Sequence, residues 1–146
     1  MSSSLTLTYD YTRDPNDDFG WLGVAVVGER GSGRGGFWVQ WQDVQEFGEK
    51  LATYPVQPDA PIKAEWGYKP WEGEALVVSI KILPAGKHGK LAVKVWLRDY
   101  IEMGEGEPSE CVRTTFTTHY SELETFRREI ANLMDGKANE AKLHAS

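Results

Sequence analysis

The residues best able to do chemistry in this chain are carboxylates gathered in loops. Paired acids catalyse hydrolysis when apolar surroundings separate their pKa values, but the acids here have other acids and glycines as neighbours. We therefore predict a solvated loop without catalytic residues. A flexible acidic loop also attracts basic partners, so the longest such loop is a candidate binding surface. Five carboxylates, with no basic residue between them, make up this loop: Asp99, Glu102, Glu105, Glu107 and Glu110.

A second acidic loop resembles the start of a calcium site but lacks its essential parts. Asp14, Asn16 and Asp18 occupy the first three ligand positions of a calcium-binding loop. Phe19 stands where that loop requires glycine, and Ala25 stands where the bidentate glutamate belongs. The pattern therefore predicts no calcium binding.

Zinc-binding and nucleophilic patterns are also incomplete. The three histidines, His88, His119 and His144, lack the spacing of a zinc site. Cys111 and His119 fall on one predicted strand, too far apart for a hydrogen bond between thiol and imidazole. We predict no metal, no cofactor and no enzymatic activity.

The glycine-rich stretch 31–36 matches the G-x-G-x-x-G pattern of nucleotide-binding loops. A dinucleotide-binding loop must lead into a helix whose N-terminus faces the phosphate, whereas a strand is predicted to follow this stretch. We therefore interpret residues 28–36 as a flexible hairpin turn.

Tryptophans are the other candidates for binding, because aromatic side chains dominate both cores and interfaces. Trp21, Trp41 and Trp66 fall on the apolar faces of predicted elements and are assigned to the core. The remaining three are candidates for exposure: Trp38, Trp71 and Trp96. Trp71 or Trp96 is predicted to join the acidic loops in the contact surface.

Length and charge narrow the class of protein. The chain of 146 residues, with one cysteine and a net charge of −6, has the size of a single domain, 1–146. Its negative field disfavours nucleic acid as a partner. Neither a secretory signal nor a long apolar run is present, so a cytoplasmic protein that does not enter the membrane is expected.

One sequence pattern occurs twice, at constant spacing, and defines the architecture. In each copy an alternating strand pattern gives way to the three-and-four spacing of a helix. The first helix is expected to begin near Asp43, with Glu46 as its capping-box partner. The second helix is expected to begin with a capping box formed by Ser121 and Glu124. The matching positions are Phe37, Val39, Trp41, Val44, Phe47, Leu51 and Tyr54, then Phe116, Thr118, Tyr120, Leu123, Phe126, Ile130 and Leu133.

Further strands are predicted at 5–11, 19–27, 62–68, 76–82 and 91–97. Strand 19–27 is expected to be covered on both faces and strand 62–68 to lie at an edge. The last two strands are expected to form a hairpin. Gly136 is placed to end the second helix, and the polar tail 137–146 is expected to fray. The fold class is α+β, with an antiparallel sheet of about seven strands, as one sheet or two packed sheets, and two helices.

Three segments together resemble small immunity proteins of bacterial polymorphic toxin systems. They are the strand and helix from Phe37 to Leu51, the V-x-V-x-L strand from Val93 to Leu97, and the F-x-x-x-I-x-x-L helix from Phe126 to Leu133. The resemblance implies a cytoplasmic, non-enzymatic binder that neutralises a toxin by covering its active site.

The sequence thus favours a protein-binding module for a basic partner, such as a toxin. One alternative is a carrier of a small ligand, or a small enzyme, that uses a cavity between sheet and helices. Another is a domain that associates with itself through exposed sheet edges.

Overall fold

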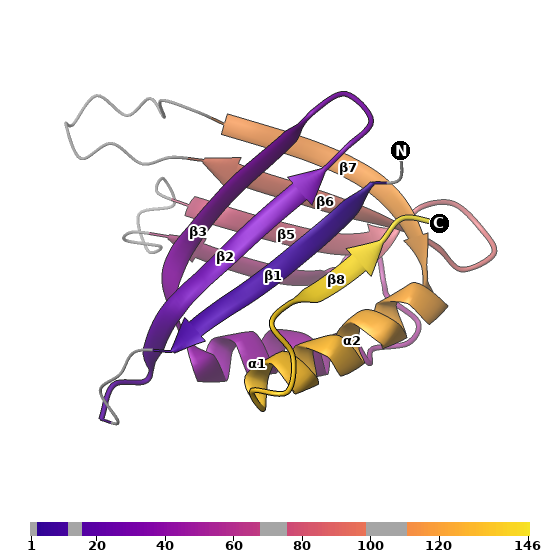
Figure 1. The fold of residues 1–146 in the computed structure, drawn as a ribbon. Helices are drawn as coiled ribbons and strands as arrows, with labels where there is room; N and C mark the ends of the chain where they lie inside the picture. The colour runs from indigo at the N-terminus through magenta and orange to yellow at the C-terminus, as the bar shows by residue number, and fades with distance from the viewer. Residues whose placement is uncertain (1–2, 12–15, 68–75, 99–110) are drawn as a thin grey trace.

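The protein folds into two antiparallel four-stranded sheets and two helices, an α+β architecture as predicted. The computed structural model describes residues 3–11, 16–67, 76–98 and 111–146. Sheet 1 has the order β3-β2-β1-β8 and sheet 2 the order β4-β5-β6-β7. The two sheets lie face to face, and both helices run beneath them (Figure 1). The elements are β1 (Ser4–Tyr11), β2 (Phe19–Val27), β3 (Ser32–Gln40), α1 (Trp41–Lys50), β4 (Ile62–Gly67), β5 (Leu76–Pro84), β6 (Lys90–Arg98), β7 (Cys111–His119), α2 (Tyr120–Met134) and β8 (Ala141–His144).

The two copies of the sequence pattern form equivalent units. Strand β3 runs directly into α1 at Trp41, and β7 runs directly into α2 at Tyr120, the matching position of the second copy. The equivalent rings of Phe47 and Phe126 meet edge to face, with centroids 6.4 Å apart. The repeat therefore places two strand-helix units against each other in one core.

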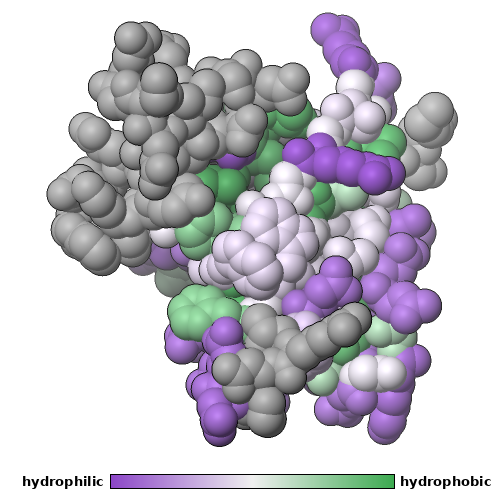
Figure 2. All heavy atoms as spheres, turned by 60° about the vertical axis from the view of Figure 1, so that its left-hand side comes forward, coloured by the Kyte–Doolittle hydropathy of each residue, from purple (hydrophilic) through white to green (hydrophobic). Residues whose placement is uncertain are grey.

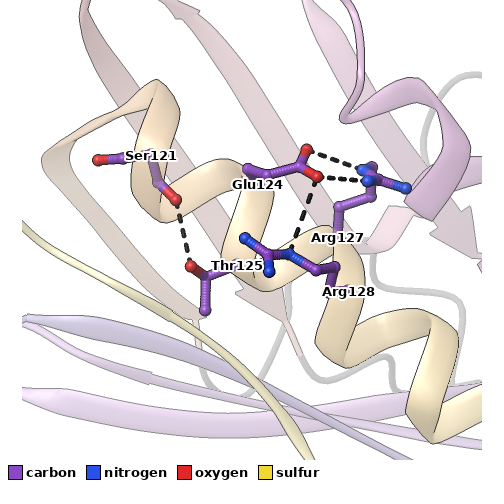
Figure 3. A network of polar contacts seen from close by, with 5 residues as sticks. All are labelled: Ser121, Glu124, Thr125, Arg127 and Arg128. Carbon is purple, nitrogen blue, oxygen red and sulfur yellow. Dashed lines mark hydrogen bonds and ion pairs between the residues drawn. The ribbon is translucent and has the colours of Figure 1, made fainter.

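The predicted capping boxes are wrong, because each helix begins earlier than expected. The N-cap residues are Gln40 and His119, and neither side chain makes a capping hydrogen bond. Ser121 consequently lies inside the first turn of α2, where its carbonyl oxygen accepts a hydrogen bond from Thr125 Oγ1. The carboxylate of Glu124 binds two neighbouring arginines instead, Arg127 by hydrogen bonds and Arg128 at 3.9 Å (Figure 3).

The core lies between the inner faces of the sheets and the helices, and only one face of β2 belongs to it. Leu22, Val24 and Val26 are almost fully buried, whereas Trp21 on the opposite face is 40% exposed. The prediction that β2 is covered on both faces is therefore wrong, and so is the assignment of Trp21 to the core. Each sheet has one inner face, and none of the described elements covers the outer face of β2 (Figure 1).

The glycine-rich stretch is mostly strand, and the hairpin turn is shorter than predicted. The reversal is closed by a hydrogen bond from Gly28 N–H to Gly31 O at 2.8 Å, and β3 begins at Ser32. A Cβ atom at Gly33 would lie 2.5 Å from Cγ2 of Val112. A side chain at this position would thus collide with β7, so glycine allows the two sheets to approach closely here.

The tail expected to fray contains strand β8, which pairs with β1. Leu5 faces Leu143 across this pair, and Ala141 and Leu143 are fully buried. The alternation of apolar and polar residues over four positions is enough to form an edge strand once β1 offers a partner. Three other predictions are confirmed. Strand β4 is a short edge strand, and β5 and β6 form a hairpin. Gly136 has a left-handed conformation, with φ of 75°.

No helix in the described part of the chain is long and apolar enough to cross a membrane.

Tyr9 ties β1 to β3 across the intervening strand. Its hydroxyl donates a hydrogen bond to Val39 O at 2.7 Å. Burial, with the nearby charges of Tyr11, Asp17 and Asp18, raises the pKa of Tyr9 to about 12. The neutral hydroxyl is thus the form that the fold stabilises.

Replacing Tyr9 with phenylalanine is expected to lower the free energy of unfolding by about 1–2 kcal/mol at neutral pH, because Val39 O loses its partner. Because folding raises the pKa of Tyr9 above the ordinary value of 10.0, its neutral hydroxyl stabilises the folded state at pH values below 10.0. This stabilisation is lost as the pH rises toward about 12. The difference between wild type and variant should therefore shrink above pH 10. Urea unfolding at neutral pH and at about pH 11 measures it, and an undiminished difference at about pH 11 would contradict this account.

Candidate partner-binding surface

Most of the predicted contact residues lie outside the part of the chain that the structure describes. These are Trp71 and the five acidic residues Asp99, Glu102, Glu105, Glu107 and Glu110. Two parts of the predicted contact surface have described surroundings: Trp96, and Asp18 of the second acidic loop.

Trp96 lies half-buried on the outer face of sheet 2, among cations of its own chain. The guanidinium carbon of Arg113 is 4.6 Å from the centroid of its ring, and that of Arg98 is 5.5 Å away. The indole N–H donates to the sulfur of Cys111. Cys111 and His119 lie at opposite ends of β7, as predicted, and Trp96 already has cation–π partners.

The strand register makes this outer face of sheet 2 basic. Lys63 faces Lys81, and Lys81 faces Lys94, so three ammonium groups stand in one row across β4, β5 and β6. Like charges directly opposite one another in a sheet are destabilising. Of the described residues whose alternation places them on this face, Glu65 is the one carboxylate, and the cations are Lys63, Lys81, Lys90, Lys94, Arg98 and Arg113.

The outer face of sheet 1 carries an exposed aromatic patch, formed by Phe19, Trp21 and Trp38 and called here the aromatic face. These side chains are 43%, 40% and 54% exposed, respectively. Trp21 and Trp38 are direct partners in the β2–β3 register, and their rings meet edge to face with centroids 5.4 Å apart. In the view that brings the left-hand side of Figure 1 forward, pale and green side chains gather in the middle of the surface and purple ones at its right and lower margins (Figure 2).

The position of Trp21 depends on a glycine in the neighbouring strand. A Cβ atom at Gly36 would lie 2.7 Å from Cζ2 of Trp21, so the indole lies directly over the backbone of β3. This close approach is possible because glycine has no side chain. The aromatic face is therefore built on two paired strands, with a glycine of β3 beneath the Trp21 ring.

Three exposed carboxylates border the aromatic face and are called here the carboxylate rim. Asp10 is the register partner of Trp21 on β1, and Asp17 and Asp18 directly precede Phe19. Asp17 Oδ1 accepts a hydrogen bond from the Phe19 backbone N–H at 2.9 Å. Asp18 Oδ2 accepts one from Gln42 Nε2 at 3.0 Å. Both acids are thus held at the start of β2, Asp17 by the backbone of Phe19 and Asp18 by the side chain of Gln42 on α1.

The sequence contains a signal for this surface that the assignment of Trp21 to the core overlooked. Thr6, Thr8 and Asp10 form the polar face of β1, and their register partners on β2 are Ala25, Gly23 and Trp21. Paired residues share a face of the sheet, so the residues of β2 that pair with the solvent-exposed face of β1 must face solvent as well. Trp21 was therefore a candidate for exposure once β1 and β2 were paired.

A hollow of about 470 Å³ lies between the two helices and the end of β1. Tyr11, Trp41, Arg127 and Met134 are among its lining residues, and the Tyr11 hydroxyl donates to Met134 O at 2.8 Å. The predicted ligand cavity was placed between sheet and helices, where Phe47, Phe126 and other buried side chains fill the space. Within the described ranges no three His, Cys, Asp or Glu residues are grouped to hold a metal ion.

Comparison with known proteins gives no relative: no family model, no curated protein and no solved structure matches this chain.

Proposed function

We propose that this protein is a non-enzymatic binding module that docks a basic protein on the aromatic face of sheet 1. The observation that carries the proposal is the pair of exposed, edge-to-face tryptophans, Trp21 and Trp38, on a sheet face that none of the described elements covers. Two large indole rings left in water are costly for a monomer, and tryptophan is the side chain most enriched among residues that dominate binding energy.

The charges around the rings define the chemistry of the partner. Asp10, Asp17 and Asp18 surround the aromatic end of this face, and the whole chain has a net charge of −6. Such a field speeds the approach of a positively charged protein. An arginine or lysine of the partner can then stack on Trp38 while a carboxylate of the rim binds its charge.

The basic face of sheet 2 supports the choice of sheet 1 as the docking side. A basic partner is repelled by the row formed by Lys63, Lys81 and Lys94. We propose accordingly that Trp96 lies outside the contact surface, and that the partner approaches from the opposite side of the molecule.

Neutralisation of a basic toxin in the cytoplasm is the most specific form of this proposal. It rests on the resemblance of residues 37–51, 93–97 and 126–133 to immunity proteins, together with the negative net charge. In that form the aromatic face covers a cationic active site and excludes its substrate.

Replacing Trp38 with alanine is expected to weaken binding of the basic partner by about tenfold to a hundredfold, the effect of removing a central aromatic contact. The partner is first captured from cells of the source organism with tagged wild-type protein and then purified, and its affinity for each variant is measured by titration calorimetry.

Tyr54→Ala is the matched control, because Tyr54 is a still more exposed aromatic side chain, at 77%, in the loop after α1. It should bind as wild type does. Both variants should keep the thermal midpoint of wild type within a few degrees. A Trp38→Ala protein that folds normally and binds with unchanged affinity would refute the proposed docking surface.

A further inference from the structure

We propose a second binding site, distinct from the aromatic face: the free edge of β7 and the groove beside it accept an extended peptide, which joins sheet 2 as a fifth strand. The groove has a volume of about 930 Å³. One wall is β7 from Cys111 to Thr117, and the other is the β2–β3 turn at residues 28–32. Residues 145–146 close one end.

The backbone of β7 presents hydrogen-bonding groups to this groove. Within the described ranges, β7 pairs with a strand on one side only, that of β6. Ser146 N–H donates to Thr117 O at 3.0 Å on the other side, which shows that the main chain of Thr117 points into the groove. Alternate residues of a strand direct their N–H and C=O groups to the same side. Arg113 and Thr115 therefore direct theirs into the groove as well.

The chain itself already uses one end of this edge. Besides the bond from Ser146 to Thr117, Thr118 Oγ1 donates to His144 O at 2.8 Å. The edge thus already accepts a main-chain partner at this end. The groove continues past Ser146 along β7 toward Cys111, where a peptide of several residues can pair in the same manner.

Glycine keeps the opposite wall close to β7 without filling the groove. A Cβ atom at Gly28 would lie 2.8 Å from the methyl group of Thr114, so the turn rests directly on the strand. Gly31 has nothing within 4 Å of a Cβ position and borders open space. The turn therefore fixes the width of the groove at one point and leaves it open at the next.

The side chains of the groove define the peptide. Arg30 and Arg113 provide two side-chain cations against one side-chain carboxylate, that of Glu29, among the lining residues of the groove. A strand paired with β7 places alternate side chains beside Arg113 and Thr115 on the outer face, and the others beside Val112 and Thr114 toward the interior. The site thus fits an extended peptide whose acidic residues alternate with small apolar ones.

The test uses fluorescence anisotropy with labelled hexapeptides of alternating glutamate and valine, lysine and valine, or glutamine and valine. We expect saturable binding, tightest for the glutamate peptide, and a loss of at least about tenfold when alternate backbone nitrogens of that peptide are methylated, because strand addition requires their N–H groups. No saturable binding of any of the three peptides would overturn the proposal, as would equal binding of the methylated peptide.

Two variants locate the site. Thr115→Pro removes an N–H that points into the groove and leaves the ladder to β6 intact, so it should reduce binding at least about tenfold, whereas Thr115→Ala should bind as wild type does. If the proline variant does not fold, Gly31→Trp fills the groove from its open side and should block the peptide. Peptide binding by Gly31→Trp equal to wild type would overturn the site. Trp38→Ala should leave peptide binding unchanged, so the two proposed surfaces succeed or fail separately.

Discussion

The Phe126→Ala variant is expected to lose about 3–5 kcal/mol of unfolding free energy, the cost of deleting a buried phenylalanine side chain and leaving a cavity. Phe126 is fully buried, and its ring contacts that of Phe47, its equivalent in the first strand-helix unit. The substitution therefore removes the ring contact between the two units. Chemical denaturation followed by tryptophan fluorescence gives the loss directly.

Arg128→Ala is the matched control for this variant, since it truncates a solvent-exposed side chain two residues later on the same helix. Its ion pair with Glu124 at 3.9 Å is exposed, so its loss should change the free energy of unfolding little. Equal stability of Phe126→Ala and Arg128→Ala would mean that α2 does not pack on the core through this face.

The Leu143→Ala variant is expected to be destabilised by about 2–4 kcal/mol, although Leu143 lies in a tail whose composition is polar. Leu143 is fully buried and faces Leu5 across the β1–β8 pair. Its truncation leaves a cavity against the edge of sheet 1. Denaturation with urea, followed by circular dichroism, measures the change.

Lys142→Ala tests whether the effect belongs to the buried position. Lys142 points outward, and the interaction that ties it to α2, from its backbone N–H to Glu129 Oε1 at 3.0 Å, survives the substitution. The control should stay within about 0.5 kcal/mol of wild type. A Leu143→Ala protein as stable as this control would indicate that β8 is not part of the folded core.

Sequence periodicity predicted the positions of the helices and strands better than it predicted which of their side chains are exposed. The two strand-helix units, the β5–β6 hairpin and the end of α2 at Gly136 follow from local alternation, helical spacing and one left-handed residue. The helix starts were missed because the chain enters each helix directly from an extended strand, before the side chains suited to capping. Strand β8 was missed because four residues form a strand only when β1 is beside them.

The candidate surface depends on sheet pairing, which single-strand patterns do not contain. Trp21 and Leu22 both lie in an apolar run, and only the second sheet decides which of them is covered. The basic row likewise arises from lysines of three different strands that the register brings together. Side-chain exposure and the separation of charges between faces therefore depend on how the strands assemble into sheets. The net charge of −6 can be counted from the sequence, but it does not show which face is basic.

The two proposed surfaces use different physics and lie on different parts of the molecule. The aromatic face offers large, rigid rings with carboxylates at the margin and suits the surface of a folded basic protein. The edge of β7 offers main-chain groups in a groove with arginines and suits an extended acidic segment. A partner that carries both features would be held at two points, with a gain in overall affinity.

Hydroxyl-radical footprinting of the complex with the captured basic partner is the most direct test of the central claim. Oxidation of Trp21 and Trp38, measured by mass spectrometry in the free protein and in the complex, reports whether their exposed rings become covered. We predict that both tryptophans are oxidised about tenfold more slowly in the complex while Tyr54 reacts at its free rate, because a hot-spot contact is fully desolvated. Unchanged oxidation of Trp21 and Trp38 in a saturated complex would contradict the assignment of the aromatic face as the docking surface.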